Sequence, residues 1–130
     1  MRPEWEAAAR RGSVEALAWQ LAEGADIDAR DRHGQTALML AAIAGHGEVV
    51  ALLSARGAAL DVTAKYGLSA LMLAVIRGHT EIVRRLVAAG ADRNLLGTGA
   101  PGFSGKTALD LAVARGDAEQ VAILRAGDAA

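Results

Sequence analysis

Residues 34–41 read GQTALMLA, and residues 67–74 read GLSALMLA, so one eight-residue pattern returns after 33 residues. The pair Gly45-His46 returns at the same shift as Gly78-His79. A third copy, GKTALDLA at residues 105–112, follows after 38 residues, which indicates an insertion of about five residues near 97–101. Self-similarity with a fixed period of this length is the sequence signature of a repeat protein.

Each copy predicts the same short unit of two helices. Thr36, Ser69 and Thr107 stand where a hydroxyl side chain can cap the first helix. Apolar side chains then recur three and four residues apart, which is typical of one buried helical stripe, and Gly45 ends that helix. A second helix follows and stops at Gly57, because glycine tolerates the left-handed conformation found at helix ends. The predicted unit is turn, helix, turn, helix.

The repeat also extends backwards to the N-terminus, where Ala8 and Gly12 precede Ala41 and Gly45 by 33 residues. This first unit is a partial copy that lacks its leading turn. We therefore expect one all-α domain over residues 1–130, a solenoid of about three full repeats behind a partial N-terminal one. The predicted units are 1–30, 31–63, 64–96 and 97–130. Stacked neighbours would share a core in which each buried Leu or Val contributes roughly 1.5–3 kcal/mol.

Aligned copies predict which side chains are interior and which cover the two ends. One column contains only alanine, at Ala8, Ala41, Ala74 and Ala112, so neighbouring repeats can approach closely. Gln20 occupies a column that otherwise holds Leu53, Leu86 and Leu124. Terminal repeats need polar outer faces, for which the sequence offers the following residues. They are Glu4, Glu6, Arg10 and Arg11 at one end, and Asp117, Glu119, Gln120, Arg125 and Asp128 at the other.

These residues resemble the ankyrin repeat, whose pattern is Gly-x-Thr-Pro-Leu-His-x-Ala-Ala, then Gly-His, Val-Val-x-x-Leu-Leu and Gly-Ala-Asp. The resemblance covers nearly the whole chain and implies an L-shaped stack with paired helices and projecting turns. The family proline is Ala37, Ala70 and Ala108 here, and the family histidine is Met39, Met72 and Asp110. Asp110 is placed to form a capping box with Thr107, and the methionines are expected to substitute packing for the missing hydrogen bonds.

The composition restricts the function classes. The formal net charge is −1, which gives no overall bias towards nucleic acid or membranes. Cysteine is absent, so disulfides and thiolate metal sites are excluded and a reducing compartment fits more easily. The first residues carry two carboxylates instead of a signal peptide, and no apolar run reaches the roughly 18 residues of a membrane helix. We expect a soluble cytoplasmic protein.

Two motifs suggest phosphate or metal binding, but the positions of their residues in the repeat explain both. Residues 100–107 approach a phosphate-binding loop containing Lys106, yet no strand is predicted before them and Thr107 aligns with Thr36. His46 and His79 could be imagined as a metal pair, although stacked helices lie about 8–10 Å apart and no third ligand aligns with them. Neither metal nor cofactor is expected, and no residues suited to catalysis stand together.

In the family, partners are held by the turn tips and by the exposed side of each first helix. The matching tip residues are Arg32, His33, Gln35, Lys65, Tyr66, Leu68, Phe103, Ser104 and Lys106. The matching helix residues are Ile43, Ala44, Ile76, Arg77, Ala114 and Arg115. All charges in this set are basic, whereas Glu48, Glu81, Glu119, Asp26 and Asp92 fall on second helices and returning loops.

We therefore predict a monomeric protein–protein interaction module that binds an acidic partner on its basic concave side, with Tyr66 and Phe103 as anchors. The alternatives are weak phosphate, nucleotide or nucleic-acid binding through Lys106 and the basic side, or simple solvation of these charges. Residues 97–101 could touch the partner or be an accident of repeat duplication, and the sequence does not rank these two possibilities.

Overall fold

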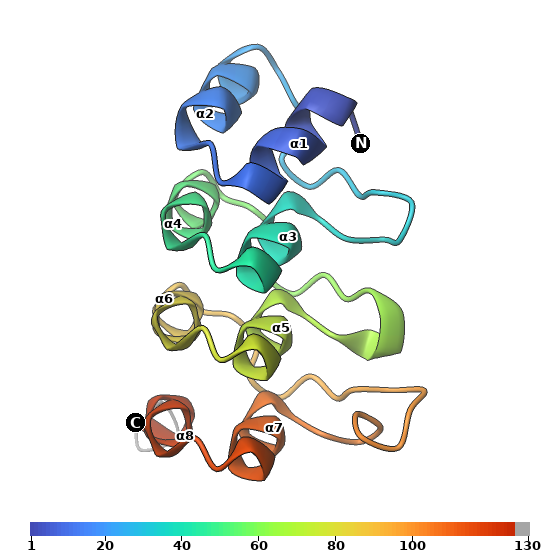
Figure 1. Cartoon of the computed structure of the whole chain (residues 1–130), viewed down its shortest axis with the longest axis vertical. Helices are drawn as coiled ribbons and strands as arrows, with labels where there is room; N and C mark the ends of the chain where they lie inside the picture. The colour runs from blue at the N-terminus through green and yellow to red at the C-terminus, as the bar shows by residue number, and fades with distance from the viewer. Residues whose placement is uncertain (127–130) are drawn as a thin grey trace.

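The computed structural model describes residues 1–126, which form four stacked pairs of α-helices (Figure 1). Figure 1 shows the first helix of each pair lying nearer to three long loops that project on the same side, with the second helices on the opposite side. The pairs are α1 (Pro3–Arg11) with α2 (Val14–Ala22), α3 (Ala37–Ala44) with α4 (Gly47–Ala55), α5 (Ala70–Arg77) with α6 (Thr80–Ala88), and α7 (Ala108–Arg115) with α8 (Ala118–Ala126).

Side-chain caps explain where the first helices begin. The hydroxyls of Thr36 and Ser69 accept the backbone N–H three residues later, each at 3.3 Å. At Thr107 the cap is a complete capping box, because Asp110 also accepts the backbone N–H of Thr107 at 3.0 Å. Each cap satisfies a backbone donor that the first helical turn leaves unpaired. The three predicted caps and the capping box are confirmed.

The core follows the predicted columns. The four alanines of the small-residue column are fully buried, so neighbouring first helices approach through it. Met39 and Met72 are also buried, which confirms that packing replaces the family's histidine at these positions. Gln20 lies in the core column and is 8% exposed, and its amide Nε2 donates to the carbonyl oxygen of Glu4 at 3.3 Å.

Each junction between repeats carries the same type of long-range hydrogen bond. The Nε2–H groups of His46 and His79 donate to the carbonyl oxygens of Arg10 and Ile43, at 2.9 and 3.1 Å. These carbonyls lie at the C-terminal ends of the preceding first helices, where no intrahelical partner is left. At the last junction Asp117 aligns with the histidines and cannot serve as this donor. Arg115 donates instead to the carbonyl oxygen of Ile76 at 2.9 Å.

The C-terminal end of the stack differs from the polar surface expected of it, whereas Glu4, Arg10 and Arg11 are exposed at the N-terminal end as expected. Gln120 is fully buried rather than solvent-facing, because it occupies the interior column of Val49 and Ile82. Glu119 and Arg125 are exposed as expected, and Asp128 lies outside the described residues. Val113, on the outer side of the last pair, is 52% exposed. The polar covering expected at the C-terminal end is therefore incomplete among the described residues.

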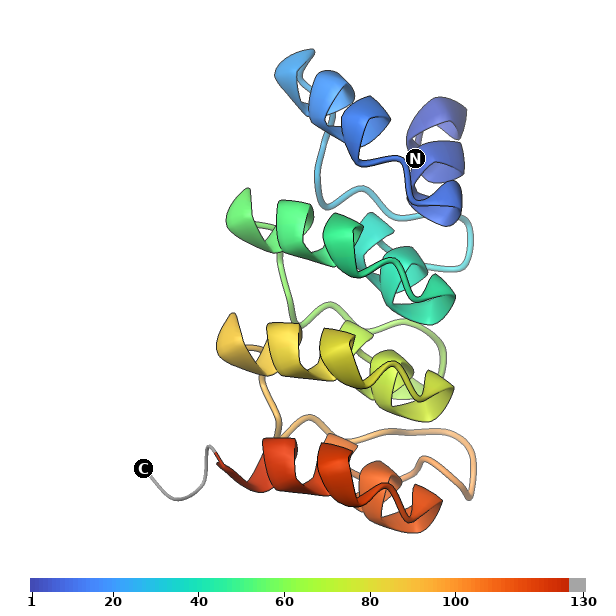
Figure 2. The ribbon, with the colours of Figure 1, turned by 60° about the vertical axis from the view of Figure 1, so that its left-hand side comes forward.

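The projecting loops contain little regular structure. Within residues 1–126 their β-bridges are isolated ones, between Arg30 and Thr36 and between Gly97 and Ser104. Figure 2, turned by 60°, shows the second helices lying across the stack, one below another along its length. No helix in the described part of the chain combines the length and the apolar character needed to cross a membrane.

Candidate functional site

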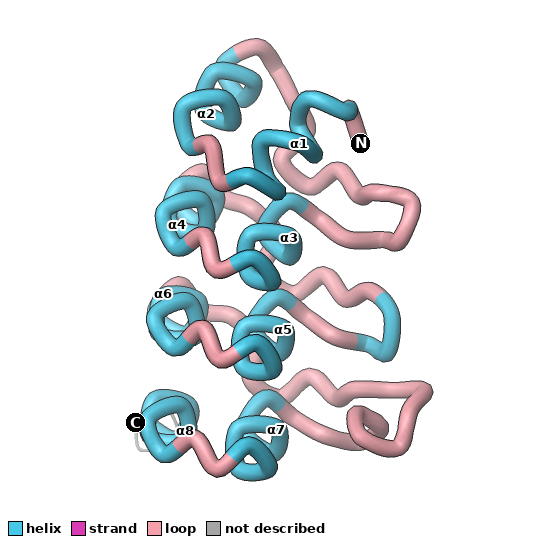
Figure 3. Tube along the Cα trace, viewed as in Figure 1, coloured by secondary structure: helices cyan, strands magenta, loops and turns pink. Residues whose placement is uncertain are grey.

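Three loop tips and the first helices form one continuous side of the molecule (Figure 3). The tips are centred on residues 31–35, 64–68 and 97–106, and each leads directly into a first helix. This arrangement places residues from all the repeats on a single surface, although they lie far apart in the sequence. We call this surface the tip side.

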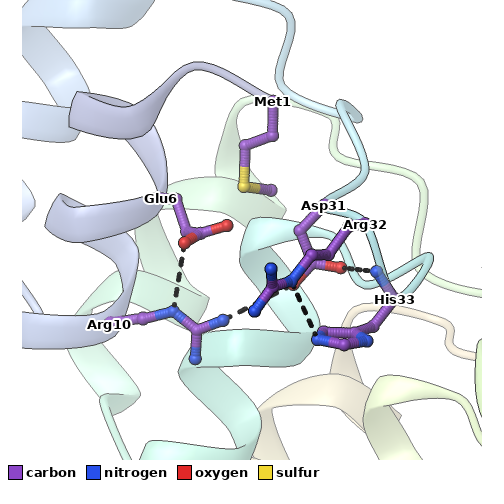
Figure 4. Close-up of a pocket in the computed structure, with 6 residues that line it drawn as sticks. All are labelled: Met1, Glu6, Arg10, Asp31, Arg32 and His33. Atoms are coloured by element: carbon purple, nitrogen blue, oxygen red, sulfur yellow. Dashed lines mark hydrogen bonds and ion pairs between the residues drawn. The ribbon is translucent and has the colours of Figure 1, made fainter.

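The first tip is organised by Asp31, whose carboxylate is almost fully buried. Its Oδ1 accepts the backbone N–H groups of His33 and Gln35, both at 2.9 Å, so the carboxylate fixes the shape of the turn. Its Oδ2 lies 3.5 Å from Arg10, which also pairs with Glu6 at 3.5 Å (Figure 4). These residues line an open recess of about 550 Å³ together with Met1, Arg32 and His33.

The charges inside this recess are largely compensated by one another. Arg10 is shared between two carboxylates, so most of its charge is compensated inside the recess. Arg32 and His33 remain exposed at the rim, 3.4 Å apart between Nε and Nε2, and neither forms a salt bridge with a described residue. The recess therefore contributes one uncompensated Arg to the tip side.

The second tip holds an aromatic ring in an unusual backbone conformation. Residues 65–67 form a short 3-10 turn in which Tyr66 has φ 63°, in the left-handed region that non-glycine residues rarely enter. The ammonium of Lys65 lies 4.9 Å from the centroid of the Tyr66 ring, within the range of a cation–π contact. The strained turn therefore presents a cation and an aromatic ring together.

The third tip contains the insertion, which folds back onto the second tip. The backbone N–H of Thr98 donates to the carbonyl oxygen of Tyr66 at 2.7 Å. The rings of Tyr66 and Phe103 lie 5.4 Å apart between centroids and are tilted by 32°. Offset aromatic pairs of this type contribute about 0.5–1.5 kcal/mol beyond their buried area. The insertion therefore braces the neighbouring tip and joins both aromatic rings into one cluster.

The predicted binding residues divide into three groups by exposure. Leu68 is 7% exposed and packs in the core, so its expected place on the surface is wrong. It ends the 3-10 turn in an extended conformation, which directs its side chain inwards. Half-buried residues are Gln35, Ile43, Ile76 and Phe103. Exposed residues are Arg32, His33, Lys65, Tyr66, Arg77, Ser104, Lys106 and Arg115.

The first helix adds a cation that the sequence prediction left out of the site. The 33-residue register aligns Arg11 with Ala44, Arg77 and the later Arg115, so all four belong to one row on the first helices. Arg11 is exposed. The same 33-residue shift is sufficient to find Arg11, although the sequence predicts for the polar residues of the N-terminal unit only a role in covering the end of the stack. We define the basic face as Arg11, Arg32, Lys65, Arg77, Lys106 and Arg115.

The two sides of the stack differ in how their charges are paired. Among residues 1–126, Arg32, Lys65, Arg77 and Lys106 form no salt bridge, whereas second-helix carboxylates do. Glu81 and Glu119 pair with Arg84 at 3.4 and 3.0 Å, and Glu48 lies 3.8 Å from Arg85. The carboxylates of α4, α6 and α8 are thus compensated by arginines, whereas most cations of the basic face have no salt-bridge partner among the described residues.

One carboxylate borders the basic face at the third tip. The backbone N–H of Thr107 donates to Asp110, and this bond holds the pKa of the Asp110 carboxyl below its usual value. The Thr107 hydroxyl and the nearby charge of Lys106 lower the pKa further. Asp110 is therefore ionised at neutral pH and partly offsets the charge of Lys106.

The loop around Lys106 is not arranged to hold a phosphate. A phosphate-binding loop needs free backbone N–H groups, but the five consecutive amides of residues 103–107 already donate within the loop. Phe103 and Ser104 donate to Ala100, Gly105 to Gly97, Lys106 to Phe103, and Thr107 to Asp110, at 2.8–3.0 Å. These bonds, together with the carboxylate of Asp110, disfavour an anion here.

The histidines serve the junctions between repeats. His46 and His79 are the residues that immediately precede α4 and α6, and each has its Nε2 committed to a carbonyl oxygen. Within the described part of the chain, no group of three or more His, Cys, Asp or Glu side chains is placed to hold a metal ion. The chemistry that this surface offers is recognition by charge, hydrogen bonds and aromatic contact.

Four helix pairs stacked in register, with loops projecting to one side, define a helical repeat solenoid. A family model described as ankyrin repeats (3 copies) matches residues 5–96 and 62–129. The chain therefore belongs to the ankyrin repeat family, whose members are generally protein–protein interaction modules. A search of curated proteins finds no match to this chain.

Proposed function

We propose that this protein binds an acidic partner protein through the basic face and the Tyr66–Phe103 pair, without catalysing a reaction. The observation that carries the proposal is the segregation of charge. Arg32, Lys65 and Arg77 are exposed without a salt bridge to any described residue, while the carboxylates of α4, α6 and α8 are paired. A surface of uncompensated cations steers an acidic partner and fixes its orientation.

Aromatic rings at the centre of this surface supply the apolar contact that charge alone lacks. Tyr66 is 36% exposed, and its ring contacts both the Lys65 ammonium and the Phe103 ring. Because the insertion braces this cluster, its rings are held in place before binding, and less conformational entropy is lost on association. Rigid aromatic groups beside cations are typical of interface hot spots.

A matched pair of charge reversals tests the proposal. Arg77→Glu changes the basic face, and Arg56→Glu changes an exposed position at the end of a second helix. The wild type and both variants are immobilised separately, and the amount of each protein that they retain is compared. The affinity of the retained partner is then measured at increasing salt concentration. We expect Arg77→Glu to weaken the partner at least tenfold, or about 1.4 kcal/mol, and Arg56→Glu to have little effect. Equal retention by both variants, or an affinity insensitive to salt, would refute the basic face as the binding surface.

A further inference from the structure

The outer side of the last helix pair presents apolar side chains that the earlier repeats bury against a following repeat. Ala9, Ala42 and Val75 are fully buried, but Val113 in the same column is 52% exposed. A second aligned position behaves in the same way: Leu17, Val50 and Val83 are buried, whereas Val121 in the last repeat is partly exposed. We call this surface the C-terminal face. An open depression of about 510 Å³ on it is lined by Val113, Gly116, Ala118, Val121, Ala122 and Arg125.

The hydrogen-bonding groups of a junction are also in place on the C-terminal face. At each internal junction, a His or Arg side chain of the following repeat lies against the glycine that ends the preceding first helix. A Cβ on Gly45 would lie 2.9 Å from His79, and one on Gly78 would lie 2.7 Å from Arg115. Gly116 ends α7 with the same left-handed conformation, yet a Cβ there would meet nothing within 4 Å among the described residues. The last repeat therefore has the glycine of a junction, but no His or Arg side chain among the described residues covers it.

The N-terminal repeat of the same chain carries side chains suited to complete that junction. Arg11 aligns with Arg115, the residue that donates across Gly78, and it is exposed on α1. Stacked on the C-terminal face, Arg11 would occupy the donor position beside Gly116 and the carbonyl of Ala114. His46 and His79 are replaced by Ser13 in this repeat, so the arginine is the group that has the necessary reach.

Trp19 supplies the apolar half of the same match. It is 66% exposed on α2, more than any other large apolar side chain in the described residues. The register aligns Trp19 with Arg85, whose side chain lies 3.8 Å from where a Cβ on Gly47 would be. Since Gly47 aligns with Ala118, a stacked copy would place Trp19 over Ala118 on the C-terminal face.

We propose that a second copy of this chain docks its N-terminal repeat on the C-terminal face, so that molecules stack head to tail. The contact continues the repeat-to-repeat interface and uses Val113 and Gly116 on one molecule with Trp19 and Arg11 on the other. It replaces the monomer expected from the sequence. Because the two surfaces differ, the contact does not close on itself, and longer stacks form as concentration rises.

The match is weaker than an internal junction. Glu4 takes the column of Ala37, Ala70 and Ala108, which are all almost completely buried, so a charge enters the contact. The association is therefore expected to be weak, with a Kd between roughly 10 µM and 1 mM, far from the nanomolar range of tight complexes.

Sedimentation velocity across that range tests the proposal. The weight-average mass of the wild type should rise from 13.3 kDa towards at least twice that value. Val113→Asp and Trp19→Asp should each abolish the rise, and a 1:1 mixture of the two should form a dimer, because each variant keeps the surface that the other lacks. Leu96→Asp is the control, since Leu96 is 55% exposed in the loop before the third tip, and it should associate as the wild type does.

Three results would overturn the proposal, provided that circular dichroism shows all variants folded. The first is a wild type that stays at 13.3 kDa throughout. The second is self-association by Trp19→Asp together with no dimer in the mixture, which would indicate a tail-to-tail contact. The third is loss of association in Leu96→Asp, which would indicate general adhesion of apolar surface.

Discussion

Replacing Gln120 with isoleucine should stabilise the protein, because its amide is buried in an otherwise apolar column. Gln120 is fully buried, and its Oε1 finds no hydrogen-bond partner among the described residues. Its Nε2 forms only a long contact, 3.4 Å from the hydroxyl of Thr80. The aligned residues Val49 and Ile82 show that a branched apolar side chain fits this position in two neighbouring repeats.

The magnitude follows from three contributions. A buried acceptor without a partner costs about 1–3 kcal/mol, and the substitution removes that cost. The loss of a long hydrogen bond costs about 0.5 kcal/mol, at the low end of the usual range. Filling the site with apolar atoms gains about 1 kcal/mol. Gln120→Ile should therefore raise the free energy of unfolding by about 1.5–3.5 kcal/mol and the melting temperature by about 5–13 °C.

Urea unfolding followed by circular dichroism measures this change. Gln120→Glu is the matched control, because it keeps the shape of the side chain and buries a charge, so it should destabilise by about 2 kcal/mol or more. The reasoning fails if Gln120→Ile unfolds at a lower urea concentration than the wild type. It also fails if Gln120→Glu is tolerated, since the position would then be open to water.

Three further predictions concern the caps and tips. Asp110→Asn should lower stability by about 0.5–1 kcal/mol at pH 7. Because the folded-state pKa of Asp110 is lowered, its contribution is present above the unfolded-state pKa and lost as pH falls through the folded-state value, so urea midpoints of variant and wild type should converge in acid. Gly78→Ala should cost more than Gly116→Ala in thermal melts, since both glycines have positive φ but only the first would bring a Cβ against Arg115; equal costs would contradict the junction. Phe103→Ala should speed amide hydrogen exchange in residues 97–106, because the ring anchors that loop, and unchanged exchange would show that the loop holds itself.

The repeat register predicted most of the fold. It located the caps at Thr36, Ser69 and Thr107, because a hydroxyl one residue before an apolar stripe has a local and repeated physical role. The all-α stack also followed from the period, since a two-helix unit cannot bury its apolar side alone. These features depend on residues that are close in the sequence or one repeat away. Equivalent positions in the aligned repeats therefore have similar surroundings, and one repeat predicts the next.

The residues whose positions differ from the prediction are affected by contacts that the alignment of the repeats does not show. Leu68 turns inwards because the turn before it passes through Tyr66 at positive φ, which no neighbouring copy shares. Gln120 is buried because its column, not its polarity, decides its environment. The contact between Tyr66 and Phe103 depends on how the loop that holds the insertion folds, and residues 97–101 have no counterpart in the other repeats from which that fold could be predicted.

Amide hydrogen exchange of the chain, with and without its captured partner, tests the central claim that partners bind the tip side. The account predicts slower exchange on binding at residues 31–35, 64–68 and 97–106, and little change in α2, α4 and α6. Protection concentrated in those second helices, with the tips unchanged, would contradict the claim and place the binding surface on the opposite side of the stack.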